Sequence, residues 1–247
     1  MIDAIYARYS RLKEKPLDPA YRPEKAIKNT LRLNADSDKL AVIFPGWHTH
    51  KFPVVNLANR LSKQGWGVIA YDFHDQILLP DDDIVVESFR HIRDTITKEL
   101  NDLLSDNKYS QVHLIGISLG NVPLAMVADR FPHFQGATLV VGGDDLAIDM
   151  WYGLRTVNIQ RAFQKMHIGI RKLDSEWHDL APASHVRHFS GKKVVFVMSL
   201  RDKFIRTKYQ QKLAEKIAKV GADIDVRPTR FGHTMTIVRF CLLDPLP

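Results

Sequence analysis

The sequence predicts an α/β protein with a mostly parallel central sheet, helices on both faces and a helical cap insertion. Strand-sized apolar runs alternate with amphipathic helical patterns along most of the chain. The run at residues 40–44, LAVIF, is apolar throughout, which is typical of a strand buried on both faces. Gly65 and Gly221 follow helical patterns and indicate where those helices end.

The length of 247 residues suits one large α/β domain with an excursion and is too short for two full enzyme domains. Hydrophobic residues make up 45% and charged residues 26%, which are ordinary values for a soluble globular protein. The formal charge of +7 raises the question of a nucleic-acid or membrane partner. Because the basic residues are scattered among acids, we expect a generally basic surface and no nucleic-acid partner.

The compartment is predicted to be the cytoplasm. Cys241 is the only cysteine, so no intramolecular disulfide can form. A secretory signal has an apolar core behind basic residues, and the first 15 residues have no such core. The longest apolar runs are strand-sized, so we expect no transmembrane segment. The oligomeric state is left open.

The N-terminal part of the chain is expected to lead into the sheet. Residues 2–14 have the apolar spacing of an amphipathic helix, and residues 15–24 hold three prolines and are expected to be an extended connector. Residues 27–33 alternate as a strand does. The polar turn at 34–38 leads directly into residues 40–44, which suggests a hairpin that feeds the parallel sheet.

The rest of the chain continues the alternation of strands and helices. We predict further strands at 67–71, 111–115, 136–141, 192–198 and 222–228, and helices at 54–64, 84–104, 119–131, 205–220 and 236–243.

Residues 144–190 break this alternation. They lie between two predicted strands yet carry several helical patches, which is more than a connecting loop needs. Because the segment leaves the sheet at the strand end where ligands bind in open α/β sheets, we interpret it as a cap or lid. Ordinary packing helices are the alternative. The predicted organisation is a single domain over residues 1–247 with a cap at 144–190.

The stretch 111–122, QVHLIGISLGNV, predicts a strand, a sharp turn and a helix with Ser118 at the turn. Gly116 and Gly120 flank the serine and allow strand and helix to approach closely. A strand-to-helix turn with an N-capping serine is the alternative. The G-x-S-x-G pattern resembles the nucleophile elbow of the α/β-hydrolase superfamily.

This resemblance implies a catalytic triad in the chain order serine, acid, histidine. His233 follows the last predicted strand, where the family carries its catalytic histidine on a loop. Asp202 follows the strand at 192–198, where most members place the acid. Asp144 and Asp145, after the preceding strand, occupy the position that a minority of members use, and we prefer Asp202 on strand order.

The resemblance also implies an oxyanion hole made of two backbone amides. One amide belongs to the residue after the nucleophile, Leu119. The other is assigned to Trp47, in the loop after the first buried parallel strand. This chain has Pro45-Gly46 where the family commonly has His-Gly, so the match is partial. The Trp47 ring is expected either to wall the acyl pocket or to be a core tryptophan.

Other features mark a divergent member. Many relatives have an aspartate followed by a Gly-His-Gly-type turn where residues 72–75 of this chain are Asp-Phe-His-Asp. This difference weakens any inference of the substrate class from the family. The histidine pairs His48 and His50, and His185 and His188, have spacings that a metal could use. Neither pair is joined by a cysteine or carboxylate set of known metal-ligand spacing. We therefore expect loop histidines, no metal and no cofactor.

The predicted function is a serine hydrolase that cleaves a carboxylic ester or thioester through an acyl-enzyme on Ser118. The apolar residues of 144–190 suggest an apolar acyl chain, although a cap needs such residues for its own packing. The fold also hosts acyltransferases and cofactor-free haloperoxidases with the same triad. A catalytically inactive binding protein that kept the fold is a further alternative.

Overall fold

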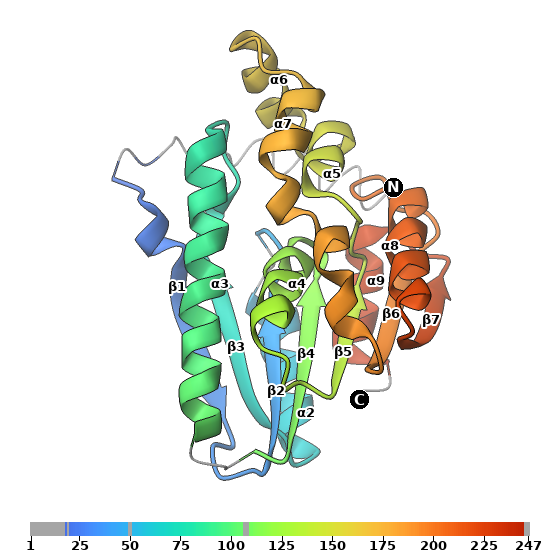
Figure 1. Cartoon of the computed structure of the whole chain (residues 1–247). Helices are drawn as coiled ribbons and strands as arrows, with labels where there is room; N and C mark the ends of the chain where they lie inside the picture. The colour runs from blue at the N-terminus through green and yellow to red at the C-terminus, as the bar shows by residue number, and fades with distance from the viewer. Residues whose placement is uncertain (1–17, 19, 49–50, 106–108, 245–247) are drawn as a thin grey trace.

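A seven-stranded sheet forms the centre of the molecule, with the strand order β1-β3-β2-β4-β5-β6-β7 (Figure 1). The computed structural model describes residues 18, 20–48, 51–105 and 109–244. Strand β1 is antiparallel to β3, and the other neighbouring strands are parallel. The strands are β1 Ile27–Leu33, β2 Lys39–Phe44, β3 Gly67–Phe73, β4 Gln111–Ile117, β5 Gly136–Val140, β6 Lys193–Ser199 and β7 Asp223–Thr229. The predicted fold class is confirmed.

The hairpin predicted between the first two strands is wrong. Strand β1 pairs with β3, and β3 separates it from β2. The physical reason is burial. Strand β2 is almost completely buried and has parallel partners on both sides, whereas every residue of β1 is half-buried or exposed, which suits the edge of the sheet. The predicted helix at 2–14 lies outside the described residues. The last two residues of the predicted connector, 23 and 24, lie in a 3₁₀ turn, Pro23–Lys25, rather than in extended chain.

Helices cover both faces of the sheet (Figure 1). One core cluster packs α3, α4 and α8 against one face, and a second packs α2 and α9 against the other. The fully buried Phe89 and Leu124 belong to the first cluster, and Leu57 and Phe240 to the second. Burying such a side chain stabilises the fold by roughly 1.5–3 kcal/mol. These helices are α2 Lys51–Lys63, α3 Asp82–Ser105, α4 Asn121–Arg130, α8 Thr207–Lys219 and α9 His233–Leu242.

The predicted helix ends are confirmed at two glycines. Gly65 follows α2 with φ +84°, and Gly221 follows α8 with φ +85°. Only glycine adopts this left-handed backbone without steric cost. Each glycine therefore fixes where the helix ends and the chain turns back toward the sheet.

Residues 144–190 form two parts. The first supplies α5 Leu146–Tyr152, α6 Val157–Lys165 and α7 Ile170–Glu176, which lie beyond the carboxyl ends of the strands (Figure 1). The second supplies the 3₁₀ segments η4 His178–Leu180 and η5 Pro182–Phe189, which pack beside α4 on the way back to β6. The second part thus takes the place of the helix that normally crosses between two parallel strands.

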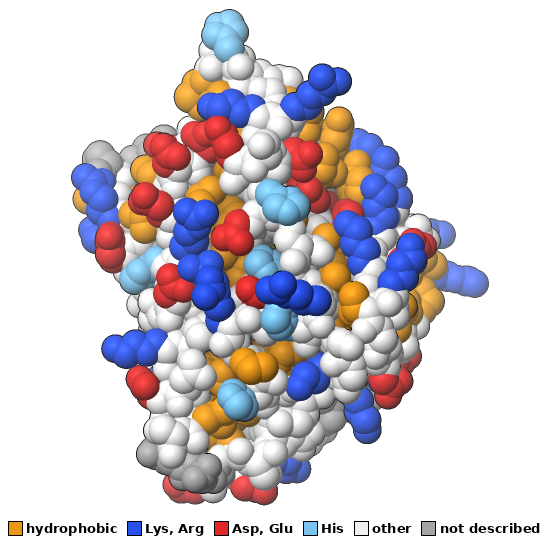
Figure 2. All heavy atoms as spheres, viewed as in Figure 1, with side chains coloured by type: hydrophobic (Ala, Val, Ile, Leu, Met, Phe, Trp, Pro, Cys, Tyr) orange, Lys and Arg blue, Asp and Glu red, His pale blue; other side chains and the backbone are white. Residues whose placement is uncertain are grey.

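The surface carries both signs of charge. Figure 2 shows Lys and Arg interspersed with Asp and Glu over the face that it presents, rather than gathered in one basic patch. Within the described ranges, none of the helices combines the length and apolar character that crossing a bilayer requires.

Candidate active site

Ser118 sits at the carboxyl end of the central strand β4, in the 3₁₀ turn Ser118–Gly120 that leads into α4. Its φ of +54° is in the left-handed region, which is strained for a residue with a side chain. A Cβ atom at Gly120 would lie 2.1 Å from the Phe44 carbonyl oxygen, so only glycine fits there. The end of β2 occupies the space beside the turn, and the turn must therefore be tight.

The side chain of Asn121 holds the serine turn in place. Its side-chain amide nitrogen donates to the carbonyl oxygens of Ser118, at 2.8 Å, and Val140, at 3.1 Å. The side chain is 1% exposed and packs against Gly116 and Gly142, at each of which a Cβ atom would lie 2.7 Å from it. Asn121 thereby joins the serine turn to the end of β5.

His233 lies beside the serine. Its Nε2 is 2.9 Å from the Ser118 Oγ, and its Nδ1 is 2.7 Å from the Asp202 Oδ2. The histidine was expected on a loop. It is instead the first residue of α9, with Gly232 as N-cap, and its ring packs edge-on against Phe204 at a centroid distance of 5.1 Å. The helix start and this packing hold the ring in place.

Asp202 has four hydrogen-bond partners. Oδ1 accepts from the backbone amides of Phe204, at 2.8 Å, and Ile205, at 3.0 Å. Oδ2 accepts from the side chain of Gln210, at 2.9 Å, as well as facing His233. Together these partners hold the carboxyl group in one orientation.

The two alternative acids are engaged elsewhere. Asp144 forms an ion pair with Lys216 at 3.4 Å. Asp145 caps α5 by accepting from the Ile148 amide at 3.0 Å. Of the three candidates, Asp202 is the carboxylate that contacts His233.

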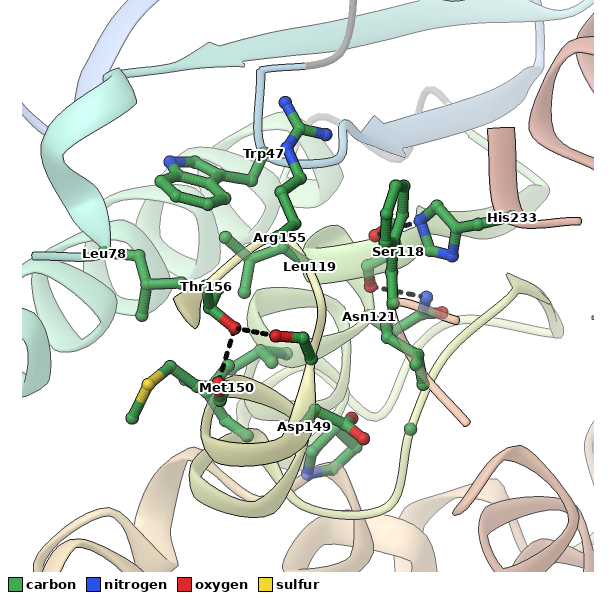
Figure 3. Close-up of a pocket in the computed structure, with 17 residues that line it drawn as sticks. Trp47, Leu78, Ser118, Leu119, Asn121, Asp149, Met150, Arg155, Thr156 and His233 are labelled. Carbon is green, nitrogen blue, oxygen red and sulfur yellow. Dashed lines mark hydrogen bonds between the residues drawn. The ribbon is translucent and has the colours of Figure 1, made fainter. Parts of the chain in front are cut away.

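Trp47 and Leu119 line a small cavity together with Ser118 (Figure 3). The close packing of Gly120 on Phe44 brings their two backbone segments together. The Trp47 indole nitrogen donates to the Asp75 carbonyl oxygen at 2.6 Å, which fixes the ring. Trp47 lines the cavity and, partly buried, packs against the main core.

The cavity has a volume of about 70 Å³ and is lined mainly by apolar side chains from the strand ends and from residues 144–190. Ser118 and His233 line it together. Two charged residues, Asp149 and Arg155, also line it. Burial raises the pKa of Asp149 well above its usual value, and the neighbouring Asp144 raises it further. The remaining lining residues include Leu78, Leu119, Val122, Leu146, Met150, Phe204 and Ile205.

Three of the four histidines singled out for their metal-like spacing have carboxylate partners. His48 lies 3.0 Å from Asp75, while His50 lies outside the described residues. His185 and His188 both face Asp129. Across the part of the chain that the structure describes, no group of three or more His, Cys, Asp or Glu side chains is arranged to hold a metal ion.

Three residues of this site were not predicted from the sequence. Gln210 holds Asp202, Asn121 holds the Ser118 carbonyl, and Arg155 lines the cavity. A signal existed for Asn121, which directly follows the G-x-S-x-G pentapeptide. Gln210 and Arg155 reach the site through tertiary packing, which no local pattern encodes.

Solved structures share this architecture. The chain is similar to a Pyrococcus furiosus esterase, with 18% identity and a TM-score of 0.56 over 85% of this chain and 81% of that one. It is also similar to carboxyl esterase 2 of Tuber melanosporum, with 14% identity and a TM-score of 0.60 over 96% and 91%. A Pyrococcus horikoshii acylaminoacyl peptidase matches at 14% identity with a TM-score of 0.61, over 94% of this chain but 40% of the peptidase.

By sequence, neither a protein-family profile nor a curated protein matches. At identities of this size, the structural similarity establishes the fold. The chain has the α/β-hydrolase fold.

Proposed function

We propose that the chain is a serine hydrolase that cleaves a carboxylic ester or thioester through an acyl-enzyme on Ser118. The observation that carries the proposal is the continuous path of short contacts from Ser118 Oγ to His233 Nε2, 2.9 Å, and from His233 Nδ1 to Asp202 Oδ2, 2.7 Å. A serine hydroxyl is a weak nucleophile near neutral pH and needs a base within hydrogen-bond reach.

In the first half of the reaction, Ser118 Oγ attacks the carbonyl carbon while its proton passes to His233 Nε2. Asp202 orients the imidazole and stabilises its protonated form. The negative charge that develops on the carbonyl oxygen is accepted by the backbone amides of Trp47 and Leu119, which we assign as the oxyanion hole. The tetrahedral intermediate collapses when His233 returns the proton to the leaving oxygen or sulfur.

In the second half, water takes the place of the leaving group. His233 removes a proton from the water as the water attacks the acyl carbon. The bond between the acyl carbon and Ser118 Oγ then breaks, His233 returns the proton to Oγ, and the acid product leaves. Residues 146–176 act as a cap over the site in this proposal, because they supply Leu146, Met150 and Thr156 to the cavity wall. The small apolar cavity favours short acyl chains. The cytoplasmic location stays a prediction.

The test is Ser118→Ala assayed on short-chain 4-nitrophenyl esters such as the acetate and butyrate. We expect kcat to fall by at least about 10⁴-fold, because the nucleophile is removed while the fold is kept. Ser62→Ala, in α2, is the matched control and should retain activity. Undiminished hydrolysis by Ser118→Ala would refute the proposal.

A fluorophosphonate probe gives a second readout. We expect covalent labelling of the wild-type protein at Ser118, located by peptide mass spectrometry, and no labelling of Ser118→Ala. A wild-type protein that the probe leaves unmodified under native conditions would point to a binding protein rather than an enzyme.

A further inference from the structure

Arg155 brings a permanent positive charge into the cavity that Ser118 and His233 line. It lies in the turn between α5 and α6, and its guanidinium carbon is 5.4 Å from the centroid of the Trp47 ring. Figure 3 shows the side chain extended from this turn toward Trp47. Among the lining residues that the structure describes, it is the one lysine or arginine.

The turn that carries Arg155 is tightly held. The Thr156 hydroxyl donates to the carbonyl oxygens of Met150 and Gly153, and the Leu154 amide donates to the Lys203 carbonyl oxygen at 3.3 Å. A Cβ atom at Gly153 would lie 2.6 Å from one backbone oxygen and 2.9 Å from another, so the turn fits closely against its surroundings. The base of the arginine side chain therefore has a fixed position.

The other end of the side chain also meets a fixed group. The Trp47 ring is held by its hydrogen bond to Asp75 and by the His48 ring, whose centroid is 4.5 Å away. A guanidinium that lies against an aromatic face keeps its N–H groups directed outward in one plane, which matches the geometry of a carboxylate. Little conformational entropy remains to be lost when an anion binds.

The acidic side chain that lines this cavity, Asp149, lies away from the guanidinium. Figure 3 shows the Asp149 carboxyl at the opposite end of the drawn residues from the Arg155 guanidinium. Burial and nearby carboxylates raise the pKa of Asp149, so this group holds its proton more readily than an ordinary aspartate. Of these two residues, Arg155 is the one whose side chain stays charged at every physiological pH.

We propose that this cavity selects esters or thioesters that carry a carboxylate group, which Arg155 binds. The inference rests on the proposed function and adds a substrate class to it. A single guanidinium in a small apolar cavity matches one carboxylate, since a doubly charged phosphate would bring a second charge without a second cation. The carboxylate can belong to the acyl part or to the leaving group, and the experiment distinguishes the two.

Two pairs of esters with equal shape test the proposal. Monomethyl succinate and methyl 4-methylpentanoate differ on the acyl side, where an isopropyl group replaces the carboxylate. The ions of 4-acetoxybenzoic acid and neutral 4-isopropylphenyl acetate differ on the leaving-group side. For at least one pair, we expect the wild-type kcat/KM to favour the anionic ester.

Arg155→Gln should then lower the ratio of kcat/KM for the anionic ester to that for its neutral partner by at least about tenfold. Arg155→Lys should recover part of it. Arg161→Gln, an exposed arginine on α6, is the matched control and should leave the ratio unchanged. A purely structural role for Arg155 would lower both rates together without changing the ratio. That outcome, or a wild-type preference for both neutral esters, would overturn the proposal.

A binding measurement separates this inference from the proposed function. Monomethyl succinate and 4-acetoxybenzoate are titrated calorimetrically into Ser118→Ala and into the double variant that also carries Arg155→Gln. We expect at least one ester to bind the single variant and to bind the double variant about tenfold or more weakly. Equal binding by the two variants, or binding by neither, would refute the role of Arg155. If the wild-type protein hydrolyses none of the esters while the difference in binding is found, the proposed hydrolysis is refuted and the role of Arg155 is not.

Discussion

At the scale of single residues, the site depends on hydrogen bonds that leave each group one orientation. Both oxygens of Asp202 are occupied, one by two backbone amides and the other by Gln210 and His233. The carboxylate cannot rotate without losing several bonds. An asparagine in its place would keep its carbonyl oxygen toward the two amides and direct its NH₂ group toward Gln210 and His233.

Asp202→Asn should therefore reduce kcat strongly while leaving most of the fold intact. The new NH₂ group would donate to His233 Nδ1, which moves the imidazole proton to Nε2 and removes the acceptor that Ser118 needs. We expect a fall in kcat of about 10⁴-fold on short-chain esters. Asp144→Asn, at the alternative acid, is the control and should leave kcat nearly unchanged. A larger loss from Asp144→Asn than from Asp202→Asn would contradict the assignment.

At the scale of elements, the serine turn depends on the contact between the start of α4 and the end of β2. A Cβ atom at Gly120 would lie 2.1 Å from the Phe44 carbonyl oxygen and 2.6 Å from the Pro45 carbonyl oxygen. Both neighbours are backbone atoms of a buried strand end, so they cannot move aside as the tip of a flexible side chain can.

Gly120→Ala should lower the free energy of unfolding by about 3 kcal/mol, measured by urea denaturation, because the two elements must separate. It should also reduce kcat, since the same shift moves Ser118 away from Trp47. Gly169→Ala is the matched control: a Cβ atom there meets nothing within 4 Å, and its φ of −102° suits alanine. The control should change stability by less than about 1 kcal/mol. Equal stabilities for the two variants would contradict this account.

The elements were also the part of the molecule that the sequence predicted best. Helix ends at Gly65 and Gly221 follow from local backbone preference, and β2 follows from its continuous apolar run. The partner of β1 was predicted wrongly because strand pairing is set by burial of the whole sheet rather than by the connecting turn. For the same reason, the contact of Gln210 with Asp202 could not be predicted, since it depends on how α8 packs beside β6.

At the scale of the whole molecule, stability should depend on pH through buried groups with shifted pKa values. His113 lies in β4, is 5% exposed, and its Nε2 is 2.9 Å from the Thr138 hydroxyl. Burial lowers its pKa from 6.5 to about 4. Asp145 acts in the opposite sense, because burial, followed by nearby Asp174, raises its pKa to about 6. The measured pH dependence is therefore a difference between opposing contributions.

The contribution of His113 can be isolated by His113→Gln, which keeps a polar group for Thr138 and removes the titration. Between pH 6.5 and about 4, the unfolded chain binds a proton at His113 and the folded chain does not, so stability falls as the pH falls. The full contribution, about 3 kcal/mol, is present above pH 6.5. We expect the wild-type free energy of unfolding, measured by urea denaturation from pH 7 to 4, to fall more steeply than that of His113→Gln. Since Asp145 is unchanged in both proteins, its opposing effect cancels in the comparison. Parallel curves of unfolding free energy against pH would show that His113 does not stay neutral in the folded protein.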